Sequence, residues 1–463
     1  MALAPEEVAK TAQDMASQLT SSLQKDAFLG KIRRYLKGDH DLPYMPRGAT
    51  AEYKALAETS ITNWLPLVSE TFSQGLAVSG YRTPSAEADD AAWAHWQRNG
   101  MDARQSVVHL AALEYGAAYV LVRKGDPDPS IKALHPTRVW ALYEDQDDDF
   151  PVLALIKNGV SAQGSELYTL LEGPNVWDIE KPKGQDNFKV IGEGPIAHGF
   201  DKPPLVRFRD RLDGENVGII KPLMTIQDRI NTAVFSLMIA IQYASFRQRW
   251  ATGLDVPIDP ETGKAVEPFK AAVDRLWISD SPDTKFGDFA QTEVAGHISS
   301  YEQAVSSLSA IAQTSPHVFL GDLINLSADA LAAAEKGTQR KLKRFQTLFG
   351  ESWELVLKLA AIAAGDPVNE GTETAQVQWA DTEARSLAQT VDALGKMVQM
   401  LSVPAEGAWE MIPGVTQATI KRWRALGSND TGLRQLADAI SRQTAPPPDP
   451  ATAEPPAEPP AAA

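Results

Sequence analysis

The feature of the sequence that most limits its fold is an apolar stretch of 17 residues, Ile230–Phe246, which lies between Arg229 and Arg247. Apolar residues recur at helical spacing across 219–249, so this segment predicts a helix about 45 Å long. From Val234 to Phe246 the helix is apolar on nearly all sides. Other protein therefore has to cover most of it.

The stretch is shorter than the roughly 20 apolar residues that a membrane-spanning helix needs. It also contains five polar residues: Asn231, Thr232, Ser236, Gln242 and Ser245. We therefore expect no membrane partner, although a scaffold or a membrane-associated protein that uses this stretch remains an alternative. A monomer would expose the helix, and a large exposed apolar patch marks an interface. A ring in which each copy covers the helices of its neighbour is the most economical solution. The candidate residues for this packing form one stripe: Ile226, Ile230, Val234, Leu237 and Ile241.

Further helices follow this one. Segment 250–297 is rich in turn residues and predicts a compact insert with a short helix at Pro268–Leu276 and a strand at Trp277–Ser279. Ile298–Gln313 is a second helix, and Thr314–Leu326 is a loop. A longer helix then runs from Ser327 to Ala364, where Gly337 and Gly350 predict bends.

The first 218 residues have a different pattern. They are mostly helical up to about residue 125, and short runs of β-branched and aromatic residues follow, separated by Gly, Pro and Asp. These runs predict an antiparallel sheet, so the fold class is α+β. The expected strands are Ala118–Val122, Arg138–Tyr143, Val152–Lys157, Leu167–Leu171, Val176–Ile179 and Phe188–Ile191. The acidic segment Glu144–Asp149 is interpreted as a solvated turn, and salt bridges are expected for the alternating Arg207, Arg209 and Arg211.

Composition excludes several function classes. With 44 Lys and Arg against 60 Asp and Glu, the net charge of −16 does not suit a tight, sequence-unspecific DNA binder. The chain has no cysteine, which excludes disulfides, thiol nucleophiles and Cys-ligated metals. No two of its seven histidines stand three or four residues apart, and it has no glycine-rich phosphate loop. We therefore predict no cofactor, no metal and no catalytic residue.

An enzyme nevertheless remains the second hypothesis. It would be an α+β hydrolase or transferase whose active site is assembled from dispersed Asp, His and Arg residues. A closed polar pocket holding a strongly perturbed carboxylate or histidine would distinguish it.

The densest basic cluster lies on the expected long helix. It consists of Lys336, Arg340, Lys341, Lys343 and Arg344. Helical phase places most of these residues on one side, opposite Leu342 and Phe345. The cluster is either a solvated face or a weak contact with a polyanion or with an acidic patch on a neighbouring copy.

Three stretches resemble, in the same order, the portal proteins of long-tailed double-stranded DNA bacteriophages. They are LPYMPRGATAEYKALAETSITNWLPLVSETFSQGLAVSGYR, GIIKPLMTIQDRINTAVFSLMIAIQYASFRQRWATGLD and TSPHVFLGDLINLSADALAAAEKGTQRKLKRFQTLFG. The resemblance covers roughly residues 20–425 and rests on the order of elements, because none of the stretches is a short diagnostic motif.

The resemblance implies a twelve-fold ring at one capsid vertex, with a channel for packaging and ejecting double-stranded DNA. It implies these partners: the terminase large subunit, the major capsid and scaffolding proteins, and a head-completion or adaptor protein. Synthesis would take place in the host bacterial cytoplasm. The implied parts are a wing (1–218), two stem helices (219–249 and 298–313) separated by a clip (250–297), a channel loop (314–326), a kinked long helix with a return strand (327–381) and a helical crown (382–440).

The channel loop supplies the candidate DNA contacts, by bulk and shape more than by ion pairing. They are His317, Val318, Phe319, Leu320, Asp322 and Asn325. The alternative is that the apolar members pack against the neighbouring loop. Residues 441–463 contain eight prolines and predict a disordered or polyproline tail.

Overall fold

The computed structural model describes residues 3–83, 86–245, 249–253, 260, 263, 283–288, 294–321, 328–366, 374–380, 387–409, 411–412, 414–415 and 417–428. The chain divides into two compact units, Met1–Gln378 and Trp379–Ala463. Several sequence predictions lie outside the described residues: the helix at Pro268–Leu276, the strand at Trp277–Ser279 and the proline-rich tail.

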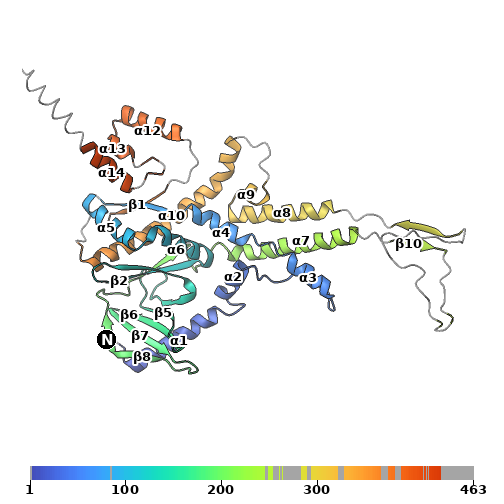
Figure 1. Ribbon diagram of the computed structural model, residues 1–463, viewed down its shortest axis with the longest axis horizontal. Coiled ribbons are helices and arrows are strands. Elements are labelled where there is room, and N and C mark those ends of the chain that lie inside the picture. The colour runs from blue at the N-terminus through green and yellow to red at the C-terminus, as the bar shows by residue number, and fades with distance from the viewer. Residues whose placement is uncertain are drawn as a thin grey trace, which may run out of the picture. The chain divides into compact units, whose positions relative to one another are not determined.

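The first unit begins with short helices (Figure 1). They are α1 (Pro5–Ser22), α2 (Phe28–Leu36), α3 (Ala51–Thr59) and α4 (Leu65–Gln74). In α4, Pro66 occupies the first turn, where its missing N–H costs no helical hydrogen bond. Thr50 caps α3 by accepting a hydrogen bond from the N–H of Tyr53.

Two antiparallel sheets form the centre of this unit. The five-stranded sheet has the order β4 (Val139–Leu142), β5 (Leu153–Val160), β6 (Glu166–Glu172), β7 (Asn175–Lys181) and β8 (Lys189–Ala197). The three-stranded sheet has the order β3 (Ser130–Leu134), β2 (Ala117–Arg123) and β9 (Leu205–Arg209). The mixture of helices and sheets confirms the α+β prediction, with two sheets where the sequence predicted one.

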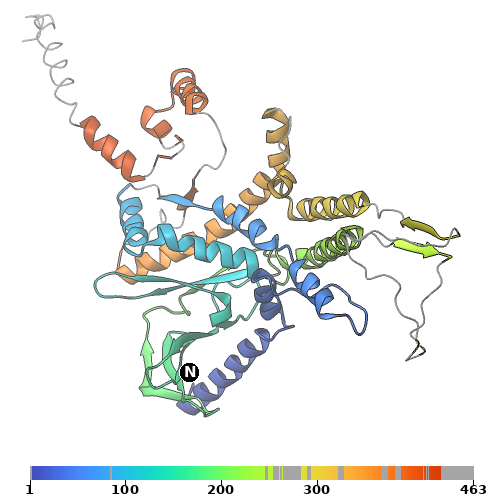
Figure 2. The ribbon, with the colours of Figure 1, turned by 45° about the vertical axis from the view of Figure 1, so that its right-hand side comes forward.

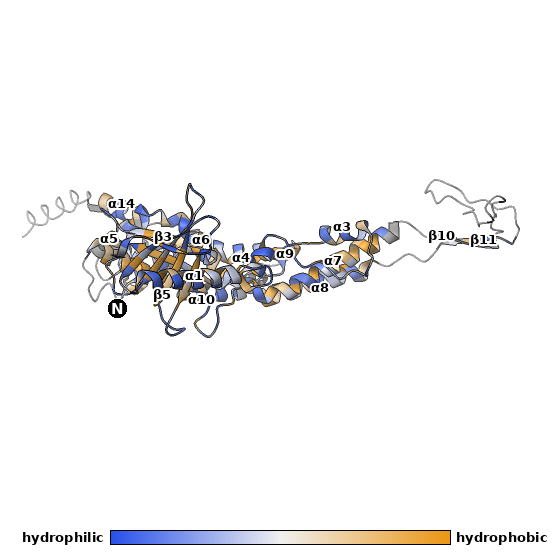
Figure 3. Cartoon of the chain, turned by 90° about the horizontal axis from the view of Figure 1, so that it is seen from below, coloured by the Kyte–Doolittle hydropathy of each residue, from blue (hydrophilic) through white to orange (hydrophobic). Residues whose placement is uncertain are grey.

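Alternation along the strands decides which side chains face which layer. In β5, Leu155 faces α1 together with Trp177 of β7, whereas Ala154 and Ile156 face the three-stranded sheet, where they meet Leu121 of β2. Figure 3 shows hydrophobic residues concentrated on these strands. The buried core therefore lies on both faces of the five-stranded sheet.

An aromatic cluster joins the three-stranded sheet to the helices beyond it. The relevant helices are α5 (Ala86–Arg98), α6 (Met101–Tyr115) and the 37-residue α10 (Ala328–Ala364). Trp353 of α10 packs edge-on against Trp96 and Phe208, with ring centroids 4.9 and 4.6 Å apart. Its indole Nε1 donates to His109 Nε2 at 2.8 Å. The His109 Nδ1–H in turn donates to the carbonyl of Leu76 at 3.0 Å.

Two helices leave this body side by side (Figures 1 and 2). They are α7 (Met224–Ser245) and α8 (Ala295–Ala312), which we call the stem. The one-turn helix η2 (Lys221–Leu223) precedes α7. Strands β10 (Arg249–Thr252) and β11 (Lys285–Asp288) pair antiparallel and belong to the insert between the stem helices. Both stem helices start and end within a few residues of the predicted bounds, although Arg249 belongs to a strand and not to the helix.

After the stem, the short helix α9 (His317–Leu320) leads to α10. The axis of α10 bends, so that its first turns run in a different direction from the remainder, as expected for a kinked helix (Figure 2). Strand β12 (Gln376–Trp379), whose residues through Gln378 belong to the first unit, pairs with β1 (Val78–Arg82). In the second unit the described helices are α12 (Leu387–Leu401), α13 (Ala405–Trp409) and α14 (Gln417–Ser428).

Two interpretations of charged segments are wrong in part. Arg207 and Arg209 do alternate on β9, but they donate to the main-chain carbonyl of Gln146 at 2.7 and 2.8 Å instead of forming salt bridges. Arg207 also lies over the ring of Tyr143, 3.8 Å from its centroid. The carbonyls of Gln146 and Asp148 accept these hydrogen bonds, while the acidic side chains of Glu144–Asp149 are mostly exposed. The segment is therefore held against β9 through its main chain. Of the three arginines, Arg211 is the one that forms an ion pair among the described residues, with Asp210 at 3.1 Å.

We predict that Trp353→Phe lowers the free energy of unfolding by about 1–3 kcal/mol, because it leaves the buried His109 Nε2 without a donor. The matched control is Trp93→Phe, which removes an indole that stacks half-buried on Trp96. Denaturant unfolding followed by circular dichroism measures both. Equal losses in the two variants would contradict this role for the hydrogen bond.

Candidate functional site

The apolar stripe of α7 divides into a covered half and an open half. Ile226 and Ile230 are buried within the chain itself, Val234 and Leu237 are half-buried, and Ile241 is 48% exposed. The prediction that Ile226 and Ile230 pack against a second copy is therefore wrong, because a single chain already buries both side chains. For Val234, Leu237 and Ile241, packing between copies stays a prediction.

Two amides on the covered half of α7 fasten the stem to the segment before α4. Gln227 Nε2 donates to the carbonyl of Thr62 at 2.6 Å, and its Oε1 accepts from the N–H of Trp64 at 3.0 Å. Asn231 Oδ1 accepts from the N–H of Thr62 at 3.2 Å and from Gln227 Nε2 at 2.9 Å. Both side chains are fully buried. The three bonds to Thr62 and Trp64 therefore satisfy main-chain groups beside the buried side chains, and the fourth joins the two amides to each other.

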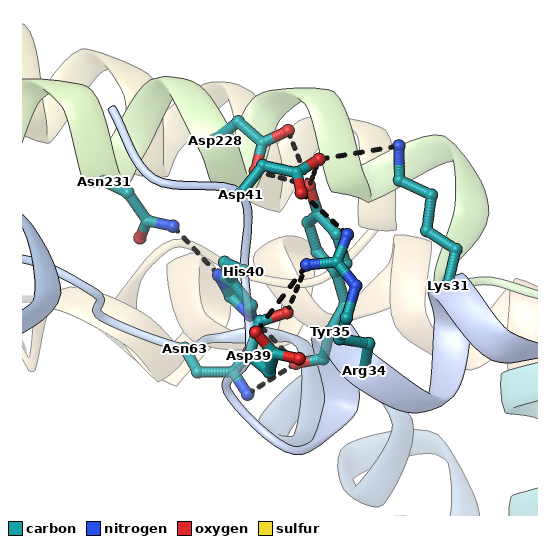
Figure 4. A network of polar contacts seen from close by, with 9 residues as sticks. All are labelled: Lys31, Arg34, Tyr35, Asp39, His40, Asp41, Asn63, Asp228 and Asn231. Carbon is teal, nitrogen blue, oxygen red and sulfur yellow. Dashed lines mark hydrogen bonds and ion pairs between the residues drawn. The ribbon is translucent and has the colours of Figure 1, made fainter. Parts of the chain in front are cut away.

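Beside these amides lies a polar network centred on Tyr35 and His40 (Figure 4). The rings of the two residues stack with centroids 4.6 Å apart, and His40 Nε2 lies 2.8 Å from the carbonyl of Tyr35. Because a carbonyl only accepts, Nε2 carries the proton, and Nδ1 is left to accept from Asn231 Nδ2 at 2.9 Å. The network thus requires neutral His40. Burial, the largest influence, accordingly lowers the His40 pKa from its usual value of 6.5.

The Tyr35 hydroxyl, which has one proton to donate, lies within hydrogen-bond distance of two carboxylates in this network. Tyr35 Oη lies 3.0 Å from Asp41 Oδ2 and 3.0 Å from both carboxylate oxygens of Asp228. A hydrogen bond from Arg34, at 2.7 Å, is the largest influence on the Asp41 pKa and lowers it. Asp228 has no such cation bonded to it, and burial raises its pKa. A proton on Asp228 would complete a chain from Asp228 through Tyr35 to Asp41.

Helix α10 holds the C-terminal end of α8, where this helix meets the body. Gln313 closes α8 in the left-handed conformation (φ 60°), which leaves the last carbonyls of the helix without helical partners. Lys341 Nζ donates to the carbonyl of Ala312 at 2.8 Å, and Thr338 Oγ1 donates to that of Gln313 at 3.1 Å. The Lys341 amine also lies over the ring of Phe72, 4.8 Å from its centroid. Burial, followed by repulsion from Arg344, lowers the pKa of Lys341 to about 8.

These contacts separate Lys341 from the rest of the predicted basic cluster. Lys336, Arg340, Lys343 and Arg344 are exposed, whereas Lys341 is turned inward. The prediction that Lys341 offers its charge to a polyanion or a neighbour is therefore wrong in this structure. For the four exposed residues it stays a prediction.

The predicted channel loop is partly helical, because α9 occupies His317–Leu320. Phe319 is buried, and its ring meets that of Trp64 edge-on at 5.6 Å. Contact of Phe319 with DNA is therefore not supported, since the ring anchors α9 to the body. Val318 is 37% exposed, and contact by His317, Val318 or Leu320 stays a prediction. Asp322 and Asn325 lie outside the described residues.

Sequence reasoning missed the residues that fasten the stem, Gln227, Asp228 and Asn231. Their signal was present: amides four residues apart on an otherwise apolar helix face are neighbours in space. Such amides are retained in a buried position only when partners satisfy them.

The described residues offer little to an enzyme. They contain no group of three or more residues suited to hold a metal ion, and none of their helices is long and apolar enough to span a membrane. Burial raises the pKa of Glu114 to about 7 and lowers that of His109 to about 3. Neither lines the cavity beside β5 or the cavity beside α10. Glu114 accepts from Ser69 Oγ, and His109 bonds within the aromatic cluster, so both belong to the core.

Comparison with known proteins gives one family. The family described as "Phage portal protein, SPP1 Gp6-like" matches residues 28–432. The portal protein of Mycobacterium phage D29 is 24% identical over 351 residues, which is 71% of this chain and 70% of that protein. The portal protein of Mycobacterium phage L5 is 24% identical over 354 residues, with the same coverage. A chain from the virion of a native gene transfer agent particle is 12% identical, with a TM-score of 0.45, over 82% of this chain and 99% of that one.

We predict that protonation of His40 destabilises the fold. Because its pKa is lowered in the folded state, its contribution is present above pH 6.5 and is lost as the pH falls through the folded-state value. The free energy of unfolding should therefore fall between pH 7 and pH 5, and less steeply in His40→Gln. The fall does not vanish, because burial also lowers the pKa of His109, His135 and His198. His317→Gln, at a half-exposed position, is the control, and equal slopes in all three proteins would contradict the prediction.

We predict that Lys341→Met loosens the end of α8, since methionine keeps the packing on Phe72 but loses the bond to Ala312. The amides of Gln313 and Thr314, bonded to Ala310 and Ser309, should exchange hydrogen about tenfold faster. Lys343→Met, on the exposed side of the same helix, should leave them unchanged. Unaltered exchange in Lys341→Met would show that the bond does not hold the junction.

Proposed function

Because the chain belongs to the SPP1 Gp6-like family of phage portal proteins, which are structural proteins of the virion, we propose that its copies form a ring around a central channel at one capsid vertex. The observation that carries this proposal is the extent of the match. Residues 28–432 include the described elements from α2 to α14, and hence both stem helices and α10.

The stem supports a ring on physical grounds. Its exposed apolar side chains come from both helices: Ile241 of α7 at 48% exposure, and Ile298 and Ile311 of α8 at 44% and 51%. A helix pair with large aliphatic residues in water gains free energy when another protein surface covers them. In a ring of identical copies, the neighbouring stem is the nearest such surface. We take twelve copies from the resemblance to portal proteins.

Double-stranded DNA is the proposed cargo of the channel. A channel has to let DNA slide, so a surface that bound phosphates firmly would hinder its function. A net charge of −16 per copy opposes such binding. The exposed cations near the stem, Lys336 among them, then give weak contacts that salt screens. His317, Val318 and Leu320 would meet the DNA by bulk and shape.

We propose a structural role without catalysis of its own. The chain lacks a glycine-rich phosphate loop, so the energy of packaging would come from a partner, the terminase large subunit. The insert between the stem helices would dock that motor and later the head-completion or adaptor protein. The major capsid and scaffolding proteins would surround the ring at its vertex.

The assembly is tested by mass photometry and negative-stain microscopy of the purified protein. We expect closed rings with a visible hole and a mass of about 0.6 MDa, which corresponds to twelve copies of 50.2 kDa. A stable monomer or dimer that binds neither capsid nor motor protein would contradict the proposal.

The role of α9 is tested by truncating its exposed side chains and keeping its buried anchor. His317→Ala combined with Val318→Ala leaves Phe319 on Trp64, so the fold of the segment should be retained. We expect intact particles with a reduced yield of DNA-filled heads. Thr347→Ala, at an exposed position on α10, is the control. Normal packaging by the double variant would count against a DNA-facing role.

A further inference from the structure

A cavity of about 300 Å³ lies where the end of α8, helix η2 and α10 meet. Four cationic side chains line it: Arg211, Arg340, Lys341 and Arg344. One carboxylate, that of Asp210, lines it as well. We call this cavity the basic pocket. Its charge differs from that of the acidic chain as a whole, which carries 60 acidic and 44 basic residues.

The carboxylate of Asp210 already has hydrogen-bond partners within the chain. Its Oδ2 accepts from the N–H of Gly218 at 3.0 Å and from Arg211 Nε at 3.1 Å, and its side chain is 3% exposed. Asp210 therefore neutralises Arg211 and holds the turn that leads into η2. Asp210 is therefore not bonded to the cations on α10.

The cations on α10 differ in what they are free to bind. Lys341 is held by the carbonyl of Ala312, as described above. Arg340 and Arg344, one turn apart and both exposed, have no ion-pair partner among the residues that the structure describes. The repulsion between Arg344 and Lys341 contributes to the lowered pKa of Lys341. An anion between these side chains would relieve that repulsion.

We propose that the basic pocket receives a carboxylate side chain from a second copy of this chain, held by Arg340 and Arg344. This inference rests on the proposed ring and adds a polar contact to its apolar one. A carboxylate suits the planar fork of a guanidinium, which binds it through two parallel hydrogen bonds. In a ring, contacts are heterologous, so the pocket of one copy meets a different surface of the next.

Two considerations favour a carboxylate over a DNA phosphate. An acidic chain presents carboxylates over much of its surface, so a neighbouring copy supplies the complementary charge. A concave pocket with several arginines would also grip a phosphate firmly, and this would oppose the sliding that a DNA channel requires.

The first test compares two double variants that remove the same charge from α10. Arg340→Gln with Arg344→Gln empties the pocket of its free cations, whereas Lys336→Gln with Lys343→Gln removes exposed lysines that do not line it. Mass photometry across protein and salt concentrations measures assembly. We expect the arginine variant to need about tenfold more protein to assemble than the wild type or the lysine variant. Equal assembly of the two double variants would overturn the proposal.

The second test asks whether the carboxylate comes from another copy. Carbodiimide joins an amine to a carboxylate in contact with it, and Arg344→Lys supplies the amine. Assembling the variant from isotopically heavy and light chains separates crosslinks between copies from those within one. We expect heavy–light crosslinks at position 344. Crosslinks only within one chain, or none at this position, would overturn the proposal.

The outcomes separate this inference from the proposed function. If the wild type forms rings and the arginine variant matches the lysine variant, the pocket proposal fails and the ring stands. If the arginine variant assembles normally but loses affinity for DNA, the pocket binds phosphate and the proposal is overturned. A wild type that neither self-associates nor binds capsid or motor protein would overturn both.

Discussion

The structure depends on how the apolar surface of α7 is covered. A helix of this length and composition cannot stand alone in water. Its two halves differ in how far the chain itself covers them. The half that contains Ile226 and Ile230 is buried within the same chain. The half that ends in Ile241 is left open, and Ile298 near the start of α8 is exposed as well. A single chain thus buries the apolar side chains of α7 near the body and leaves those near the other end exposed.

Polar contacts hold each stem helix at the end that meets the body. At α7, the buried amides of Gln227 and Asn231 bond the main chain of the segment before α4. At α8, Lys341 and Thr338 satisfy its last carbonyls from α10. Buried polar groups are costly when a partner is lost, so these junctions favour one direction of the stem over others. A fixed direction is what a ring needs, because each copy has to meet the next at the same angle.

The sequence predicted the elements whose pattern is local. The 3.6-residue periodicity of α7 and α8 and the alternation along β5, β6 and β7 located these elements to within a few residues. It did not predict β3 or β9 as strands, since short runs such as Leu205–Arg209 become strands through pairing with β2. Nor did helical phase show that Lys341 turns inward, or that Phe319 is buried on Trp64. Those orientations depend on contacts with residues far away in the sequence, which periodicity does not contain.

The central claim is that the open half of the stem is covered by a second copy, and hydroxyl-radical footprinting tests it most directly. The assembled particle is compared with the dissociated chain, residue by residue. The account predicts that Ile241 and Ile298 become protected on assembly, whereas Met15 of α1, buried against the five-stranded sheet, is protected in both states. Equal labelling of the two isoleucines in particle and dissociated chain would contradict the account.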